Sequence, residues 1–274
     1  MHGTDGIYNC SNSGNVYGYG IYNSNQTIIG GVIGVIFGTE DKYAEATNLK
    51  NTGNVYGKGP KVGGTVGVIE RYCKINNCEN RGNVTGESNY VGGIFGTASG
   101  YCSFKKCRNY GEVLGKSHYV GGISGTIGPE SNMEECANYA TITGGNRYTG
   151  GIVGLVSHTN NVTNSTVEKC YNVGNINGVT EVGGITGLLG GSQGEGTIIK
   201  CYNNGIITGT THLGELIGRQ TNTTGLNTFN NLFYLANSRG LTAVGGVADD
   251  TENKIQSTTE DLTYEQFTTW IEAQ

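Results

Sequence analysis

The sequence predicts an all-β protein: a parallel β-helix (β-solenoid) of about seven coils with a short C-terminal capping helix. A unit of about 30 residues recurs along the chain, which is typical of solenoids. Apolar and polar residues alternate within each unit, and 49 of the 274 residues are glycine. We expect a solenoid domain over residues 1–235 and a cap, formed by a turn and a short helix, over residues 236–274. Parallel crossovers favour a right-handed winding.

The repeat unit reads apolar-x-x-Cys-x-Asn-x-Gly-x-Val-x-Gly and continues, after a short gap, as Val-Gly-Gly-Ile-x-Gly. Its cleanest copy runs from Ile75 to Gly96. The anchor position is occupied by Cys10, Leu49, Cys78, Cys107, Cys136, Cys170, Cys201 and Leu232. Successive anchors lie 39, 29, 29, 29, 34, 31 and 31 residues apart. The additional residues therefore fall in the gaps, where solenoid loops accept insertions.

The alternation inside a copy has a period of two, which indicates strands. Stacked coils would place equivalent residues on neighbouring strands about 4.8 Å apart. The anchors lie an even number of residues from the apolar residues, so they face the same side of the strand. We therefore expect a column of buried thiols rather than metal or catalytic cysteines. This column comprises Cys78, Cys107, Cys136, Cys170 and Cys201. Cys73 and Cys102 form a second column, whose spacing permits a disulfide and also permits free thiols.

An asparagine follows each anchor by two residues, except after Leu232. The column comprises Asn12, Asn51, Asn80, Asn109, Asn138, Asn172 and Asn203. Asparagine side chains can hydrogen-bond along a stack of strands, so we expect a structural amide ladder here.

Charges beside the anchors support an arrangement in which equivalent residues of successive copies lie side by side. The residues just before three successive anchors are Lys106, Glu135 and Lys169, and those just after another three are Lys50, Glu79 and Arg108. Opposite charges on neighbouring strands are mildly stabilising. The alternation of sign therefore favours a parallel stack.

The end of the chain predicts a helix between residues 262 and 273. Leu262, Phe267, Trp270 and Ile271 would lie roughly on one face of it. Thr258 or Thr259 is the expected N-cap. A helix here would cover the unpaired strand edges at the open end of the solenoid.

The repeat unit, over residues 7–235, resembles the GLUG-motif repeats of bacterial surface proteins. These include the N-terminal parts of IgA-specific metallopeptidases and large adhesin-like proteins. The resemblance implies an extracellular module, either secreted or on the cell surface, with other domains of a larger surface protein as its neighbours. It implies no activity, because the repeat carries no known catalytic residues.

Composition and motifs exclude several functions. A net charge of −5 and few basic residues argue against nucleic acid as a partner. The longest apolar stretch, residues 28–37, is too short to cross a bilayer, so we expect no membrane insertion. The four histidines have no metal-ligand spacing, and we expect neither a metal site nor a cofactor.

One aromatic column is a candidate binding site. Tyr90, Tyr119 and Tyr148 precede the Gly-Gly strand in three consecutive copies, with His118 and Arg147 beside them. The rings could stack on a host or bacterial surface glycan, or they could form a ladder that only stabilises the solenoid. The ladder is the interpretation we favour.

Taken together, these features predict a non-catalytic surface module that acts as a rigid spacer or as an adhesive segment binding a glycan or a protein. The alternative is a β-helix carbohydrate-active enzyme, either a polysaccharide lyase or a glycoside hydrolase. Such an enzyme needs clustered carboxylates on one outer face. The sequence columns show no such pair on adjacent coils.

Overall fold

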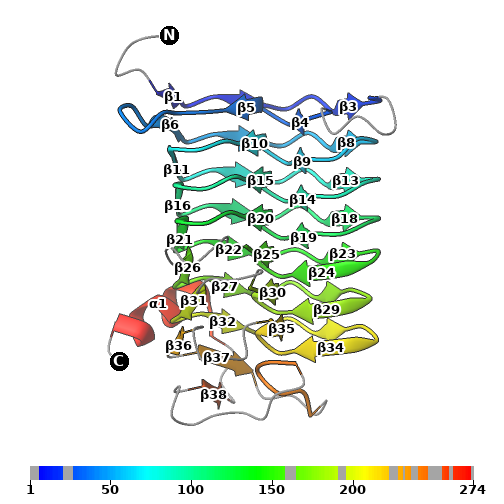
Figure 1. The fold of residues 1–274 in the computed structure, drawn as a ribbon, viewed down its shortest axis with the longest axis vertical. Helices are drawn as coiled ribbons and strands as arrows, with labels where there is room; N and C mark the ends of the chain where they lie inside the picture. Colours follow the sequence, from blue (N-terminus) through cyan, green and yellow to red (C-terminus); the bar gives the residue numbers. More distant parts are fainter. Residues whose placement is uncertain are drawn as a thin grey trace.

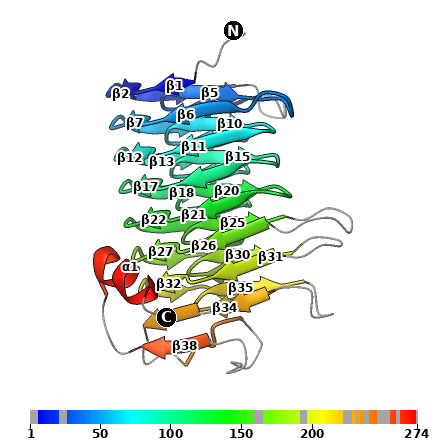
Figure 2. The ribbon, with the colours of Figure 1, turned by 90° about the vertical axis from the view of Figure 1, so that its left-hand side faces the viewer.

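The computed structural model describes residues 6–20, 27–157, 165–190, 196–221, 228–230, 232–235, 240–245, 255–258 and 262–272. Within them the chain winds as a parallel β-solenoid with one short C-terminal helix, which confirms the predicted fold class. Figures 1 and 2 show the coils stacked along one axis, from the N-terminal to the C-terminal end of the chain. Five parallel sheets, here named A to E, run along the stack.

The strands of each sheet are given in spatial order from the N-terminal end. Sheet A contains β1 (Ile7–Tyr8), β6 (Ala44–Thr47), β11 (Cys73–Asn76), β16 (Ser103–Lys105), β21 (Asn132–Glu134), β26 (Ser165–Glu168), β31 (Gly196–Ile199) and β36 (Thr228–Asn230). Sheet B contains β2 (Ser11–Asn12), β7 (Lys50–Asn51), β12 (Glu79–Asn80), β17 (Arg108–Asn109), β22 (Ala137–Asn138), β27 (Tyr171–Asn172), β32 (Tyr202–Asn203), β37 (Leu232–Leu235) and β38 (Ile255–Thr258).

Sheet C contains β3 (Val16–Gly18), β8 (Val55–Gly57), β13 (Val84–Gly86), β18 (Val113–Gly115), β23 (Ile142–Gly144), β28 (Ile176–Asn177) and β33 (Ile207–Thr208). Sheet D contains β4 (Ile29–Gly30), β9 (Val62–Gly63), β14 (Val91–Gly92), β19 (Val120–Gly121), β24 (Arg147–Gly150), β29 (Thr180–Gly183) and β34 (Thr211–Gly214). Sheet E contains β5 (Ile33–Ile36), β10 (Val66–Ile69), β15 (Phe95–Ala98), β20 (Ser124–Ile127), β25 (Val153–Val156), β30 (Thr186–Leu189) and β35 (Ile217–Gln220).

The pairing register is the one that the repeat predicts. Asn80 lies opposite Asn51 on one side and Asn109 on the other, one repeat away in each direction. The longer step in the next copies does not disturb the column, because Asn138 still pairs with Asn172. The inserted residues therefore lie outside the strands.

Two apolar columns of side chains fill the interior. The larger contains the thiol column together with residues of sheets A and E, such as Ile75 and Phe95. The smaller lies between sheets C and D and contains mainly valine and isoleucine, such as Val84 and Val91. Both run the length of the stack, so every coil contributes to burial and is held by its neighbours.

The predicted helix exists as α1 (Tyr264–Glu272), but its start and its position differ from the expectation. Thr263 is the N-cap: its Oγ1 accepts a bond from the Gln266 amide at 3.2 Å, and the Gln266 side chain accepts one from the Thr263 amide at 2.9 Å. This reciprocal pair is a capping box. Thr258 instead ends β38, and Thr259 lies outside the described residues.

Helix α1 lies on the flank of the solenoid rather than over its open end, as Figures 1 and 2 show. Its apolar residues Phe267 and Ile271 are buried against Ala137, Tyr171 and Tyr202, which point outward from sheet B. The C-terminal end is instead extended by strand β38, which pairs with β37, and by a bridge from Val244 to Ile217. Pairing thus continues past residue 235, where we predicted the solenoid to stop.

Polar contacts fix α1 on this flank. The Tyr264 hydroxyl donates to the Glu135 carbonyl at 3.3 Å, and the Arg108 guanidinium lies 4.4 Å from the centre of the Tyr264 ring. Burial raises the pKa of Tyr264 to about 12. In the described part of the chain, no helix is long and apolar enough to cross a membrane.

Candidate functional site

The three candidate tyrosines form one continuous stack beside sheet D. The ring centres of Tyr90 and Tyr119 are 4.9 Å apart with an interplanar angle of 5°. Those of Tyr119 and Tyr148 are 5.1 Å apart at 19°. The structure therefore brings the three residues together in the order that the repeat predicts.

This stacking decides which surfaces the tyrosines present. Both faces of the Tyr119 ring are covered by its neighbours, and the Arg147 guanidinium lies 4.8 Å from the centre of the Tyr148 ring. All three side chains are half-buried. A sugar ring binds aromatic residues through an open ring face, and the faces of this stack lie against each other. The arrangement favours the structural ladder that we preferred.

The backbone at these tyrosines has an unusual conformation. Tyr90, Tyr119 and Tyr148 have φ angles of 62°, 65° and 67°, in the left-handed region. A non-glycine residue there costs roughly 1–2 kcal/mol. Lys61, Glu181 and His212 share this conformation, so the bend into sheet D has it in every coil after the first. Ring stacking offsets part of its cost where the residue is tyrosine.

We expect the triple replacement of Tyr90, Tyr119 and Tyr148 by alanine to destabilise the solenoid by about 3–5 kcal/mol, because it removes the stacking contacts and half-buried ring area. Chemical denaturation measures this loss. The exposed Tyr17 is a matched control, and its replacement by alanine should cost less than about 1 kcal/mol. A triple variant as stable as the parent would mean that the rings are free for a ligand.

His118 and Arg147 do lie beside the tyrosines, but both have protein partners. The His118 ring nitrogen Nε2 lies 3.3 Å from the Asn146 side-chain nitrogen. Arg147 binds the Glu181 carboxylate through Nε at 3.0 Å and Nη2 at 2.8 Å. Arg147 is thus held by Glu181 rather than left open for an acidic sugar.

Glu181 is a buried carboxylate between two arginines. Arg219 also contacts it at 3.3 Å, and Thr180 donates a short hydrogen bond to it. Burial alone would raise the pKa of Glu181, but the bonds from Arg147, Thr180 and Arg219 lower it to about 2. This cluster links strands β24, β29 and β35, so it joins three successive coils.

Replacing Glu181 by glutamine should destabilise the protein by about 2 kcal/mol at pH 7, since two half-exposed arginines lose their buried partner. The folded-state pKa lies below the unfolded value of about 4.3, so the wild-type advantage is complete above that pH and disappears as pH falls toward 2. Urea denaturation of both proteins at several pH values measures this difference in stability. Glu87→Gln, at a surface pair, should cost under about 0.5 kcal/mol, and a Glu181 effect independent of pH would contradict the assignment.

The asparagine column forms the predicted amide ladder. From Asn12 to Asn172, each Nδ2 group donates to the carbonyl two residues later in its own coil and to Oδ1 of the asparagine in the next coil. For Asn109 these distances are 2.8 Å to Gly111 and 2.9 Å to Asn138. The second glycine of the Gly-Gly pair leaves room for the ladder: a Cβ on Gly93 would lie 2.4 Å from Cγ of Asn109. The asparagines therefore have a structural role.

The thiol column is buried as predicted. Cys78, Cys107, Cys136, Cys170 and Cys201 have no exposed surface. Burial raises the pKa of the Cys136 and Cys170 thiols well above the ordinary value. Cys73 and Cys102 are free thiols too, in contact with each other across neighbouring strands. Nucleophilic chemistry needs an accessible thiolate, and this column offers none.

The five column thiols should resist alkylation in the native protein and react after denaturation. Cys10, which is only partly buried, should react faster and serves as the internal control. Replacing Cys107 by alanine should cost about 1–2 kcal/mol through the loss of a small buried group. Mass spectrometry of the alkylated peptides measures the labelling, and rapid native labelling of Cys107 would contradict its burial.

The structure reveals one carboxylate pair that sequence columns missed. Glu134 lies directly opposite Glu168 in sheet A, and each stands two residues before its anchor. Lys105 lies 3.0 Å from Glu134, and Lys169 lies 3.7 Å from Glu134 and 3.9 Å from Glu168. Burial tends to raise the pKa of Glu134, but the bond from Lys105 and the charge of Lys169 lower it below its ordinary value. A lowered pKa is the opposite of what a general acid needs.

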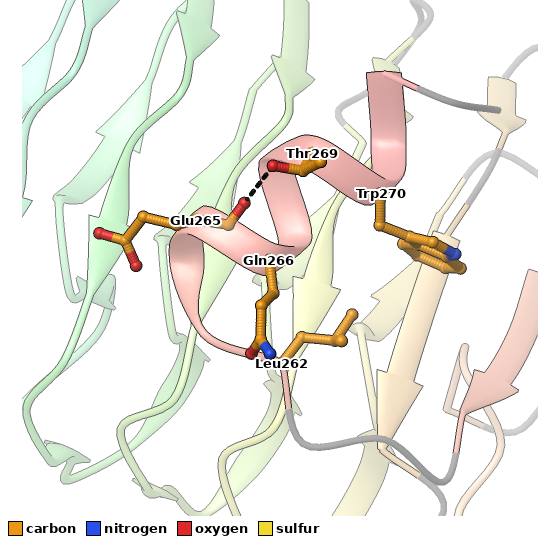
Figure 3. A pocket seen from close by; sticks show the side chains of 5 residues that line it. All are labelled: Leu262, Glu265, Gln266, Thr269 and Trp270. Atoms are coloured by element: carbon orange, nitrogen blue, oxygen red, sulfur yellow. Dashed lines mark hydrogen bonds between the residues drawn. The ribbon is translucent and has the colours of Figure 1, made fainter.

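A depression lies along α1, lined by Leu262, Glu265, Gln266, Thr269 and Trp270 (Figure 3). It is open and shallow, and Thr269 there donates a hydrogen bond to the Glu265 carbonyl at 2.9 Å. Within the described ranges, no three His, Cys, Asp or Glu side chains come together to hold a metal ion. The chain matches no known family model, and no curated protein or solved structure matches it either.

Proposed function

We propose that the chain is a non-catalytic module of a bacterial surface or secreted protein, and that it serves as a rigid spacer which holds other domains of that protein apart. The observation that supports this most is the continuity of the stack. Each of sheets A to E runs through at least seven coils, and neighbouring strands in it come from successive coils.

Side-chain ladders support rigidity because they oppose bending on several sides of the stack. The asparagine ladder lies inside, the tyrosine stack lies beside sheet D, and the Arg147–Glu181–Arg219 cluster joins three coils. Bending would stretch the hydrogen bonds of at least one sheet and separate stacked groups. A spacer that transmits force needs this property.

Adhesion to a surface glycan or protein is the second part of the proposal, and it has weaker support. The candidate tyrosines cover one another's ring faces, two on Tyr119 and one each on Tyr90 and Tyr148. The competing enzyme hypothesis has Glu134 and Glu168 as its best carboxylates, and lysines neutralise both. The geometry therefore favours the spacer over both the adhesive module and the enzyme.

Single-molecule pulling through the two ends of the chain tests the proposal. A rigid spacer should keep its length until whole coils unfold, each releasing about 10 nm for a 29-residue repeat. Gradual lengthening before any such step would contradict it. Incubation with a panel of polysaccharides tests the alternative: cleavage that disappears in E134Q or E168Q would establish an enzyme.

A further inference from the structure

The first coil of the stack is less well covered than every coil after it. Three of its inward side chains, Asn12, Val16 and Ile33, are only partly buried, whereas Ile29 and Ile36 are buried. Their register partners in the second coil, Asn51, Val55 and Val66, are 0–1% exposed. The interior of the solenoid therefore opens at this end.

Backbone and apolar groups gather at the same end. Strands β1 to β5 form the N-terminal edges of sheets A to E. Among the described residues, each is paired on one side only. Figures 1 and 2 place them at the end of the stack where the chain begins. Six of the eleven large apolar side chains that are exposed in the described residues belong to this coil: Ile7, Tyr8, Tyr17, Tyr19, Val35 and Phe37.

The three equivalent interior positions near the opposite end are better covered. The inward residues Cys201, Asn203 and Ile207 of the last full coil are at most 2% exposed. Tyr234 lies opposite Asn203, where another asparagine would continue the ladder. Unpaired strand edges that are both long and apolar are usually covered in native proteins. In the described residues, strands β33, β34, β36 and β38 at this end also pair on one side only, so the two ends differ in how well their inward residues are covered rather than in their strand edges.

The asparagine ladder has a direction, and this direction specifies the chemistry of the partner. Asn12 donates through Nδ2 to Asn51 at 2.9 Å, so its Oδ1 faces the open side, where it accepts from the Gly14 amide at 3.2 Å. The amides of Lys50 and Thr52 donate to carbonyls of the first coil, both at 2.9 Å. By the same register, the amides one coil earlier, at Ser11 and Ser13, point to the open side.

We propose that the N-terminal coil is a docking surface for a further parallel coil of the same repeat, one that carries an asparagine at the ladder position. Its Nδ2 group donates to Oδ1 of Asn12, its carbonyls accept from the amides of Ser11 and Ser13, and its valines cover Val16 and Ile33. A second copy docked end to end would instead place two Oδ1 acceptors opposite each other, so a like-facing dimer is disfavoured.

A fusion tests this on the full chain. A copy of residues 69–97, one 29-residue coil, is placed directly ahead of Met1, so that the copied Asn80 falls one coil above Asn12. The fusion should raise Tm by more than about 4 °C, because each added coil contributes a nearest-neighbour interface. It should also slow hydrogen exchange at Ser11 and Ser13 at least about tenfold.

The matched control carries Asn80→Asp in the fused copy alone. An aspartate has no N–H group and places a charged oxygen against Oδ1 of Asn12, so most of the gain in Tm and protection should be lost. Equal behaviour of the two fusions, or unchanged exchange at Ser11 and Ser13, would overturn the proposal. So would light scattering that shows a dimer of the original chain which the fused coil converts to a monomer, since the surface would then belong to a second copy.

Discussion

Replacing Asn109 by aspartate is expected to unfold the central coils of the solenoid. The Asn109 side chain is fully buried, donates to Gly111 and Asn138, and accepts from Asn80 at 2.9 Å. Aspartate cannot donate, so two buried acceptors would face a buried carboxylate. The cost should exceed about 4 kcal/mol, which is a large share of the roughly 5–15 kcal/mol by which domains are stable.

Alanine at the same position separates the cost of the lost hydrogen bonds from the cost of the buried charge. Asn109→Ala removes the bonds without adding a charge and should cost about 2–4 kcal/mol, because a donor of Asn80 and acceptors at Gly111 and Asn138 lose their partner. Urea denaturation and circular dichroism measure both variants.

The exposed Asn83 provides the matched control. Its Oδ1 accepts from the Glu112 amide at 3.0 Å, and an aspartate keeps that acceptor. Asn83→Asp should therefore change the stability by less than about 0.5 kcal/mol. An Asn109→Asp protein within 1 kcal/mol of the parent, which is about the size of one ordinary hydrogen bond, would show that the ladder does not hold the coils together.

The columns could be predicted from the sequence because a parallel solenoid converts sequence period directly into spatial neighbours. Asn80, Asn109 and Asn138 are 29 residues apart and lie opposite one another. The inward orientation of Cys107 followed from its parity with Val113, and both are buried. No long-range folding information was needed for these positions.

Two pairs of neighbours were hidden because only part of their columns was compared. Glu134 and Glu168 stand two residues before their anchors, and Arg147 and Glu181 stand eleven residues after theirs, so alignment on the anchors places each pair on neighbouring coils. Ring orientation was hidden too: the repeat placed Tyr90 and Tyr119 in one column, but stacking depends on the side-chain rotamers and on the left-handed backbone at both.

The sequence does contain an indication of where α1 lies. The position after the anchor is charged in the central coils, as at Glu79 and Arg108, but becomes alanine and then tyrosine at Ala137, Tyr171 and Tyr202. An outward-facing column that turns apolar marks a surface that another element covers. Here the amphipathic helix is that element.

Loss of α1 is the second change for which we expect a large effect. Phe267 is fully buried, with its ring centre 5.7 Å from those of both Tyr171 and Tyr202. The Tyr171 hydroxyl donates to the Leu262 carbonyl at the start of the helix. Phe267→Asp should cost more than about 3 kcal/mol and release the helix, because a charge cannot remain between two aromatic rings. Glu272→Ala, at an exposed position, should change little.

Deleting residues 262–274 distinguishes two reasons why such a protein would aggregate. This truncation removes α1 but leaves strand β38 paired with β37, so the end of the stack is unchanged while Tyr171 and Tyr202 become exposed. If the uncovered flank drives association, light scattering should show oligomers and an apolar dye should bind. If the open end were the cause, as the sequence alone indicated, this truncation would stay monomeric and only the removal of β38 as well would produce oligomers. The contacts of Phe267 with two outward tyrosines favour the flank, because the strands at the end keep their partner in the shorter chain.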